Sequence, residues 1–401
     1  MKNHPFYGAI ECDIEVPPAL YDYFSEYSPL FANTKVPFEK IGAHMQDHVN
    51  HFKLSKKPRR LLVGGMKGEK ILLASDLLRW YMLHGMVVTQ IHQVVEYIPS
   101  KCFAPFVNDI STCRRHGDRD KSLSIISDTM KLIGNSAYGS SIMDKEKHLS
   151  ISYAKDERTA SLKINCPRFK KLTELADNCY EVESFKRKIV MDVPIQLGYF
   201  VLQYAKLRML EFHYDCIDVL LDRSCYQLME TDTDSLYYAL SGKTLDETIA
   251  NEKRLEYHRN VYDCCNDSSH PLWFPRKCCA AHSVYDNRTP GLFKCEYTGT
   301  EMVALCSKTY IVSNQQDGSR KFSCKGVSRR SLGANLVEKY KTVLDTQIVG
   351  SGVNTGFRSK DNHIFTYTQT RCGFTYFYCK REVLADGINT QPLDIVLAPS
   401  C

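Results

Sequence analysis

The chain has 401 residues, of which 43% are hydrophobic and 24% are charged; 52 basic and 46 acidic residues give a net charge of +6. This length allows two or three subdomains with cores of their own, and the composition excludes an intrinsically disordered chain. The apolar runs are too short to span a membrane, and the first residues lack the apolar stretch of a signal peptide. We therefore expect a soluble intracellular protein without a membrane partner. The sequence does not decide between the nucleus, the mitochondrion and other compartments.

The 17 cysteines are odd in number and form no C-x-x-C pair, which is typical of a protein from a reducing compartment. One stretch is rich in residue types that bind zinc, and its members are Cys264, Cys265, His270, Cys278, Cys279 and His282. Adjacent cysteines are not the usual spacing of zinc ligands. The favoured interpretation is therefore small core or loop residues, with zinc as the alternative.

The first predicted elements combine strands and helices. Alternating apolar residues predict a strand over residues 10–16, ended by two prolines. A helix is expected over residues 75–83, with Ser75 as its N-cap and Gly85 as its stop, and a strand over residues 86–98. Residues 114–121 are predicted to form a polar, charged turn. The pattern then predicts a helix over residues 122–138 that ends at Gly139.

The second half of the chain continues this mixture. Residues 148–193 are predicted to be rich in strands, with charged helical pieces between them, and Pro194 begins a helix that reaches about residue 221. Residues 226–240 predict a hairpin with an acidic turn. A short strand is expected over residues 309–313, a helix over 335–344, and aromatic-rich strands to about residue 378. Because β-α-β alternation is not regular, an α+β architecture fits this order best.

The acidic turn has the sequence M-E-T-D-T-D-S-L-Y over residues 229–237. Two carboxylates, Asp232 and Asp234, lie two residues apart, and such clustered negative charge costs free energy unless a cation offsets it. Hard divalent cations such as Mg²⁺ prefer carboxylate oxygens, and a pair of them can activate an attacking oxygen and stabilise a leaving one. The alternative is a solvated acidic turn, since aspartate is common in turns.

A second segment, K-L-I-G-N-S-A-Y-G over residues 131–139, lies upstream. Lys131, Asn135 and Tyr138 fall on one face of the predicted helix. A cation, an amide and an aromatic ring suit a nucleoside triphosphate, because the charge can meet phosphate and the ring can meet base or sugar. An ordinary amphipathic helix is the alternative.

Together the two segments resemble the K-x-x-x-N-S-x-Y-G and D-T-D-S motifs of family B DNA polymerases, in the order of that family. Lys308 and Tyr310 match the family's K-x-Y motif further downstream. The resemblance covers nearly the whole chain and is closest to protein-primed enzymes of linear plasmids, phages and self-synthesising DNA transposons. RNA-dependent polymerases are disfavoured, because reverse transcriptases carry a different acidic motif and lack N-S-x-Y-G.

The resemblance implies a right-hand fold of palm, fingers and thumb, without the N-terminal exonuclease domain. It divides the chain into a palm segment with an insertion (1–100), fingers (101–147), a DNA-encircling insertion of the protein-primed type (148–192), the palm with its acidic hairpin (193–305), and the primer-binding motif with the thumb (306–401). The implied activity is template-directed transfer of deoxynucleotides to a 3′-hydroxyl. The implied partners are template and primer DNA, deoxynucleoside triphosphates and a priming terminal protein.

The resemblance also assigns roles to residues. Asp232 and Asp234 would bind two Mg²⁺ ions at the catalytic centre, and Lys131 would contact the triphosphate of the incoming nucleotide. Asn135 and Tyr138 would line its pocket, with help from a second basic residue of the fingers. Arg119 and Lys121 are equal candidates for that helper, and Lys308 and Tyr310 would hold the primer end.

A basic strip follows the K-x-Y motif. Between residues 308 and 330 a single acid, Asp317, stands against six basic residues: Lys308, Arg320, Lys321, Lys325, Arg329 and Arg330. Such a strip suits contacts with backbone phosphates, and a solvated loop is the alternative.

The chain departs from the family at one motif. The D-x-x-S-L-Y-P-like motif, which supplies another catalytic aspartate, is not found, and the predicted strand around Asp13 resembles the strand that follows it. Asp13 and Glu15 also resemble the opening acids of an exonuclease, but the distance to Lys131 is too short for that domain. We therefore expect an incomplete two-metal site and poor polymerisation by this chain alone. The competing hypothesis is a non-catalytic, DNA-binding remnant of a mobile-element polymerase.

Overall fold

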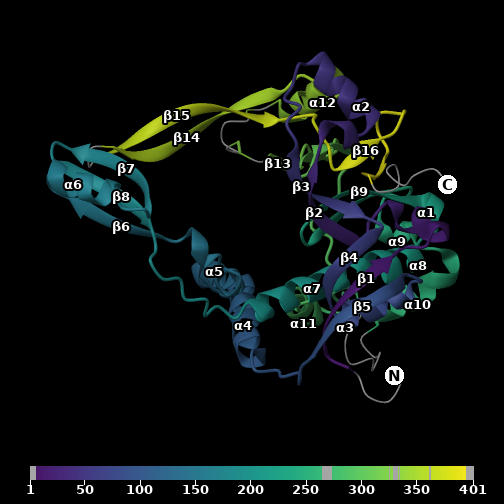
Figure 1. Cartoon of the computed structure of the whole chain (residues 1–401). Helices are drawn as coiled ribbons and strands as arrows, with labels where there is room; N and C mark the ends of the chain where they lie inside the picture. The colour runs from purple at the N-terminus through teal and green to yellow at the C-terminus, as the bar shows by residue number, and fades with distance from the viewer. Residues whose placement is uncertain are drawn as a thin grey trace.

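The computed structural model describes residues 6–263, 273–324, 326, 327, 333, 335–360 and 363–393 of the chain. These residues form a mixed α and β protein, as the sequence predicts. Figure 1 shows a compact part from which two extensions leave toward the same side of the view. One extension is a pair of helices that carries a small β module, and the other is a long β hairpin.

An antiparallel sheet in the compact part has the strand order β4-β1-β5. Its strands are β1 (Gly8–Glu15), β4 (Lys67–Ala74) and β5 (Val87–Glu96), and the nearby helices are α1 (Tyr21–Ser25), α3 (Ser75–Leu83) and α7 (Ile195–Glu211). Cys12 and Ile14 of β1 are buried in one core with Leu77 of α3 and Leu210 of α7. The predicted strands over residues 10–16 and 86–98 and the helix over 75–83 are thus confirmed. The N-cap of this helix is Ala74 rather than Ser75, whose hydroxyl instead accepts the backbone N–H of Gly8 at 3.3 Å.

A second core forms where α7 ends. The helix continues as a π-helical segment, η5 (Phe212–Ile217), and a last turn, α8 (Asp218–Leu220). This core also includes side chains of the hairpin β9 (Tyr226–Asp232) and β10 (Ser235–Leu240), and of α10 (Asn251–Tyr262). Both the predicted helix over 194–221 and the predicted hairpin over 226–240 are confirmed.

A third core joins residues from the two ends of the chain. Met45 and Val63 pack there with Ile311, Tyr340 and Phe374. Its elements and those around it are α2 (Ala43–His51), β2 (Leu30–Val36), β3 (Arg59–Gly65), β11 (Glu301–Cys306), β12 (Thr309–Ser313), β13 (Arg320–Cys324), α12 (Leu336–Thr346), β16 (Arg381–Val383) and β17 (Thr390–Pro392). The strand predicted over 309–313 is confirmed, as is the helix predicted over 335–344, which begins and ends within two residues of its predicted bounds.

The helical extension consists of α4 (Ala104–Arg119) and α5 (Ser124–Ser141), which pack side by side. Beyond them, β6 (Leu149–Ala154), α6 (Glu157–Ile164), β7 (Phe169–Ala176) and β8 (Cys179–Phe185) form a module with the strand order β6-β8-β7. Leu149 at its entrance pairs with Phe185 at its exit. The second extension is the hairpin of β14 (Gly350–Lys360) and β15 (His363–Phe374).

Two predictions on the helical extension are wrong. Residues 114–121 do not form a turn, because α4 runs to Arg119. The charged side chains lie on a helix that is exposed on much of its surface. One of them, Asp118, forms an ion pair with Arg288. Gly139 does not end α5, which continues to Ser141. A glycine inside a helix costs about 1 kcal/mol and does not by itself stop it. The end of α5 instead lies against Gly198 of α7, where an added Cβ would be 2.1 Å from the side chain of Ile142.

The remaining short elements are α9 (Leu245–Thr248), α11 (Ala280–Asp286) and the 3₁₀ turns Pro18–Leu20, Phe38–Lys40, Lys121–Leu123, Lys145–Lys147 and Arg223–Cys225. Of the helices in the described ranges, none combines the length and the apolar character needed to cross a membrane.

Candidate functional site

The acidic hairpin places its two aspartates on either side of a tight turn. Asp232 is the last residue of β9 and pairs with Ser235, the first residue of β10, so that Thr233 and Asp234 form the turn. Thr233 has a φ of 60°, a left-handed conformation that is costly for a β-branched residue. Residues held in such conformations are concentrated at functional sites.

The K-x-Y segment docks directly on this hairpin. Lys308 lies in the turn between β11 and β12, and its Nζ forms an ion pair of 2.8 Å with Oδ1 of Asp232. Its backbone N–H donates to Oε1 of Glu230 at 3.3 Å. The hydroxyls of Tyr237 and Tyr310 are 2.7 Å apart. Two segments predicted separately from the sequence are thus neighbours in the structure.

The groups at this contact have shifted pKa values. The hydrogen bond to Asp232 raises the pKa of Lys308, so that the ammonium is held charged beside the carboxylate. Burial raises the pKa of Glu230 to about 7, against the opposing hydrogen bond from the backbone of Lys308. The site therefore combines the charged ammonium of Lys308 with carboxylates that differ in burial.

The predicted nucleotide-binding face lies on α5. Lys131 and Asn135 are exposed there, and Tyr138 is half-buried. Among the described residues, no hydrogen bond or ion pair joins Lys131 to the hairpin. It is among the positive charges that lower the pKa of Glu296, after the hydrogen bond from Lys321 as the main cause.

Lys321 contacts both Glu296 and the hairpin. Its Nζ is 3.0 Å from the carboxylate of Glu296 and lies 5.7 Å from the ring centre of Tyr237 in β10. The two candidates for the second basic residue of the fingers, Arg119 and Lys121, are exposed at the turn between α4 and α5. Among the described contacts, none joins either of them to the hairpin.

The hairpin fits part of a magnesium site. Asp232 and Asp234 offer hard oxygen donors, and Mg²⁺ commonly takes one or two carboxylates from a protein. The side chain of Asp232 is 21% exposed, and Lys308 already neutralises part of its charge. A site for two ions would need further carboxylates. The donors at this turn therefore suit one ion better than two.

Asp13 belongs to a different environment. Its carboxylate accepts the backbone N–H of Lys70 at 2.7 Å and Nε2 of His92 at 2.8 Å, both on strands beside β1. These hydrogen bonds lower the pKa of Asp13, with that from Lys70 as the larger cause. Glu15, the other acid of the exonuclease-like pattern, pairs with Lys67 at 3.1 Å.

The basic strip falls partly within the described residues. Lys308 and Lys321 make the ion pairs given above, and Arg320 lies exposed on β13. The other predicted members, Lys325, Arg329 and Arg330, lie outside the described residues, as do Cys264, Cys265 and His270 of the cysteine-rich stretch.

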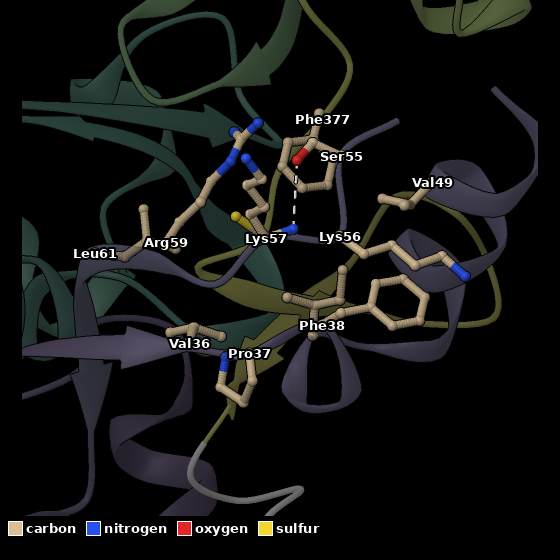
Figure 2. Close-up of a pocket in the computed structure, with 12 residues that line it drawn as sticks. Val36, Pro37, Phe38, Val49, Ser55, Lys56, Lys57, Arg59, Leu61 and Phe377 are labelled. Atoms are coloured by element: carbon tan, nitrogen blue, oxygen red, sulfur yellow. Dashed lines mark hydrogen bonds between the residues drawn. The ribbon is translucent and has the colours of Figure 1, made fainter. Parts of the chain in front are cut away.

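A second basic segment was not predicted from the sequence. Residues 53–60 contain Lys53, Lys56, Lys57, Arg59 and Arg60 without an acid. Figure 2 shows three of these side chains around a shallow hollow with two aromatic rings. Nζ of Lys56 lies 4.6 Å from the centre of the Phe38 ring, and the guanidinium of Arg59 lies 4.9 Å from that of Phe377. The density of basic residues in this short stretch is the signal that could have identified it.

Comparisons with protein-family models, with curated proteins and with solved structures found no match to this chain.

Proposed function

We propose that this chain is the palm, fingers and thumb part of a DNA-directed DNA polymerase of family B type. The observation that carries the proposal is the meeting of the acidic hairpin with the K-x-Y segment. Lys308 contacts Asp232, and Tyr310 contacts Tyr237 although 73 residues separate the two tyrosines. A carboxylate pair with an adjacent cation and phenols can position a primer end beside a metal-bound triphosphate.

Each segment has a role in this proposal. Asp232 and Asp234 hold Mg²⁺, which when bound stabilises the charge that develops on the triphosphate. Lys308 orients Asp232 and, with Tyr310, positions the end of the primer. Lys131 binds the triphosphate from α5 when the fingers approach the hairpin, and Asn135 and Tyr138 bound the same pocket.

The two extensions serve DNA binding in this proposal. The β6–β8 module corresponds in position to the insertion that the resemblance assigns to DNA encirclement, and the β14–β15 hairpin belongs to the segment assigned to the thumb. Both leave the same side of the compact part. In this proposal, both extensions contact the DNA duplex that leaves the acidic hairpin.

The decisive experiment compares Asp234→Asn with the unchanged chain. The unchanged chain is expected to incorporate nucleotides slowly on a primed template with Mg²⁺. Asp234→Asn should lower that rate by a further factor on the order of a hundred, because the variant lacks a charged metal ligand. DNA affinity, measured by fluorescence anisotropy, should stay the same. Asp317→Asn is the matched control, since Asp317 is exposed in a turn between β12 and β13 and caps only its own loop.

Two outcomes would change the conclusion. An unchanged chain that binds primed DNA but incorporates nothing would favour the non-catalytic remnant. A chain that neither incorporates nucleotides nor binds DNA would overturn the proposal.

A further inference from the structure

Three metal-ligating side chains meet at the start of α11. The sulfurs of Cys278 and Cys279 and a ring nitrogen of His282 all lie within 4.8 Å of one another. Sγ of Cys278 is 3.1 Å from Nδ1 of His282, and Sγ of Cys279 accepts the backbone N–H of His282 at 3.5 Å. Sulfur and nitrogen atoms on one tetrahedral zinc ion lie about 3.5–3.8 Å apart. These three groups can therefore reach a common ion with small side-chain rotations.

The backbone that carries these ligands is held by a buried ion pair. Asp286, which is 2% exposed, accepts the backbone N–H of Arg276 at 3.0 Å. It also accepts two bonds from the guanidinium of Arg276, at 2.8 and 3.0 Å. Burial raises the pKa of Asp286, but these bonds outweigh burial, and its pKa lies below the ordinary value. Arg276 and Asp286 flank the three ligands in sequence, so the clamp fixes the loop that presents them.

Helix α11 also contacts α4 of the helical extension. The guanidinium of Arg115 on α4 lies 3.9 Å from the ring centre of Tyr285 on α11, and its Nε donates to the Tyr285 carbonyl at 3.1 Å. Arg288, just after α11, bonds the carboxylate of Asp118 on α4 at 2.6 Å. The cluster thus lies beside the junction where α4 docks on the compact part.

The donor set selects the metal. Two thiols and an imidazole are soft or borderline ligands that favour zinc, whereas Mg²⁺ takes oxygen. The acidic hairpin shares no ligand with this cluster. We propose that Cys278, Cys279 and His282 bind a zinc ion that fixes the loop before α11 and thereby stabilises the docking of α4. A tetrahedral zinc site takes one further ligand beside these three.

The first test measures zinc in the 401-residue chain. After incubation with Zn²⁺ and removal of excess metal, elemental analysis should give one zinc per chain. Cys278→Ser and His282→Gln should each weaken zinc affinity at least about tenfold, since even the loss of a group that only supports a ligand costs that much. Cys102→Ser, at an exposed cysteine of the loop before α4, is the control and should retain zinc.

Cobalt provides a readout that does not depend on the folding of a variant. Co²⁺ added to the zinc-free, unchanged chain should give sulfur-to-metal charge-transfer bands and the visible bands of tetrahedral cobalt. The double variant Asp232→Asn, Asp234→Asn should bind zinc unchanged, which separates this inference from the proposed polymerase activity. Zinc that is absent from the unchanged chain, retained by the ligand variants or missing from the hairpin variant would overturn the zinc site.

The docking role has its own test. Removing zinc with a chelator should raise the hydrogen exchange of the α11 segment and of the α4 turn that carries Arg115, while β1 keeps its protection. Equal exchange of α4 with and without zinc would overturn the structural role of the ion.

Discussion

The contact between Tyr237 and Tyr310 connects the acidic hairpin to the K-x-Y strand by a single hydrogen bond between two phenols. Burial is the main cause that raises the pKa of Tyr310, and the bond to Tyr237 adds to it, so the Tyr310 phenol stays protonated at neutral pH. A neutral hydrogen bond of this kind contributes about 1 kcal/mol.

We therefore predict that Tyr237→Phe and Tyr310→Phe are not additive. Each single change should lower the free energy of unfolding, and the double change should cost less than the sum by about 0.5–1.5 kcal/mol. Urea denaturation of the four proteins measures this coupling. Additive effects would show that the two hydroxyls do not interact in solution.

His213 should make stability depend on pH. Its ring is 2% exposed, with Nδ1 2.9 Å from the Tyr238 hydroxyl. Burial, with a smaller contribution from Arg223, lowers its pKa to about 4. The unfolded chain, with an ordinary pKa of about 6.5, takes up the proton first. This contribution is complete above about pH 6.5 and is lost as the pH falls toward 4, to a total of about 3 kcal/mol.

The measurement is the free energy of unfolding of the chain at several pH values between these limits. His213→Asn should flatten the slope, whatever it does to the stability at pH 7. His116→Asn, at an exposed histidine of α4, should leave the slope of the unchanged chain. Parallel slopes for all three proteins would contradict the assignment to His213.

At the scale of single residues, the sequence predicted the positions of the two aspartates but not their contacts. The sequence around Asp232 and Asp234 predicted an acidic turn in a hairpin, and the structure places both residues at that turn. The ion pair with Lys308 could not be predicted, because it depends on how the β11–β12 turn docks and on a left-handed backbone at Lys308. The motif gave no basis to choose between Arg119 and Lys121, and both lie exposed away from the hairpin.

Among the secondary-structure elements, those with a buried face were predicted best. The alternation around Ile14 identified β1, because one side of that strand packs into a core. The ends of α4 and α5 were not predicted. Their surfaces are largely exposed, so charges and glycines that usually mark turns are tolerated there. Where a helix has no buried face, its local sequence pattern says little about where the helix begins and ends.

The β6–β8 module should be removable as a unit. Because Leu149 and Phe185 are paired partners, a short Gly-Ser linker can replace residues 149–185 without stretching the chain. We predict that the shortened chain stays folded and dissociates faster from primed DNA, because it lacks the module that we propose to contact the duplex. Stopped-flow dissociation measures the rate, and circular dichroism reports the fold. An unchanged rate would separate the module from DNA binding.

For the molecule as a whole, the arrangement of the cores was the least predictable feature. Residues 36–63 share a core with residues 303–393, although the resemblance assigned these segments to palm insertion and thumb. No local sequence pattern predicts that these two segments share a core, because each consists of strands and helices with ordinary apolar faces. The arrangement brings the basic segment 53–60 into contact with Phe377 near the end of the chain.

DNA binding should depend steeply on salt, because phosphate contacts release counterions. We predict that the triple change Lys56→Ala, Lys57→Ala, Arg60→Ala weakens binding to all DNA sequences alike. It should reduce the slope of log affinity against log salt by about one for each phosphate that the variant no longer neutralises. Fluorescence anisotropy at several salt concentrations measures the slope. Lys243→Ala, an exposed lysine outside this segment, should not change it, and an equal slope for the triple variant would exclude the segment from the DNA interface.

The pairing of Leu149 with Phe185 also bears on how such a chain can evolve. A segment that leaves and re-enters its host at neighbouring backbone positions can be inserted or deleted in one recombination event, while α5 and α7 stay in place. Differences in length among homologous chains should therefore concentrate between these two residues. The acidic hairpin and its K-x-Y partner, whose contacts span distant segments, should vary only together.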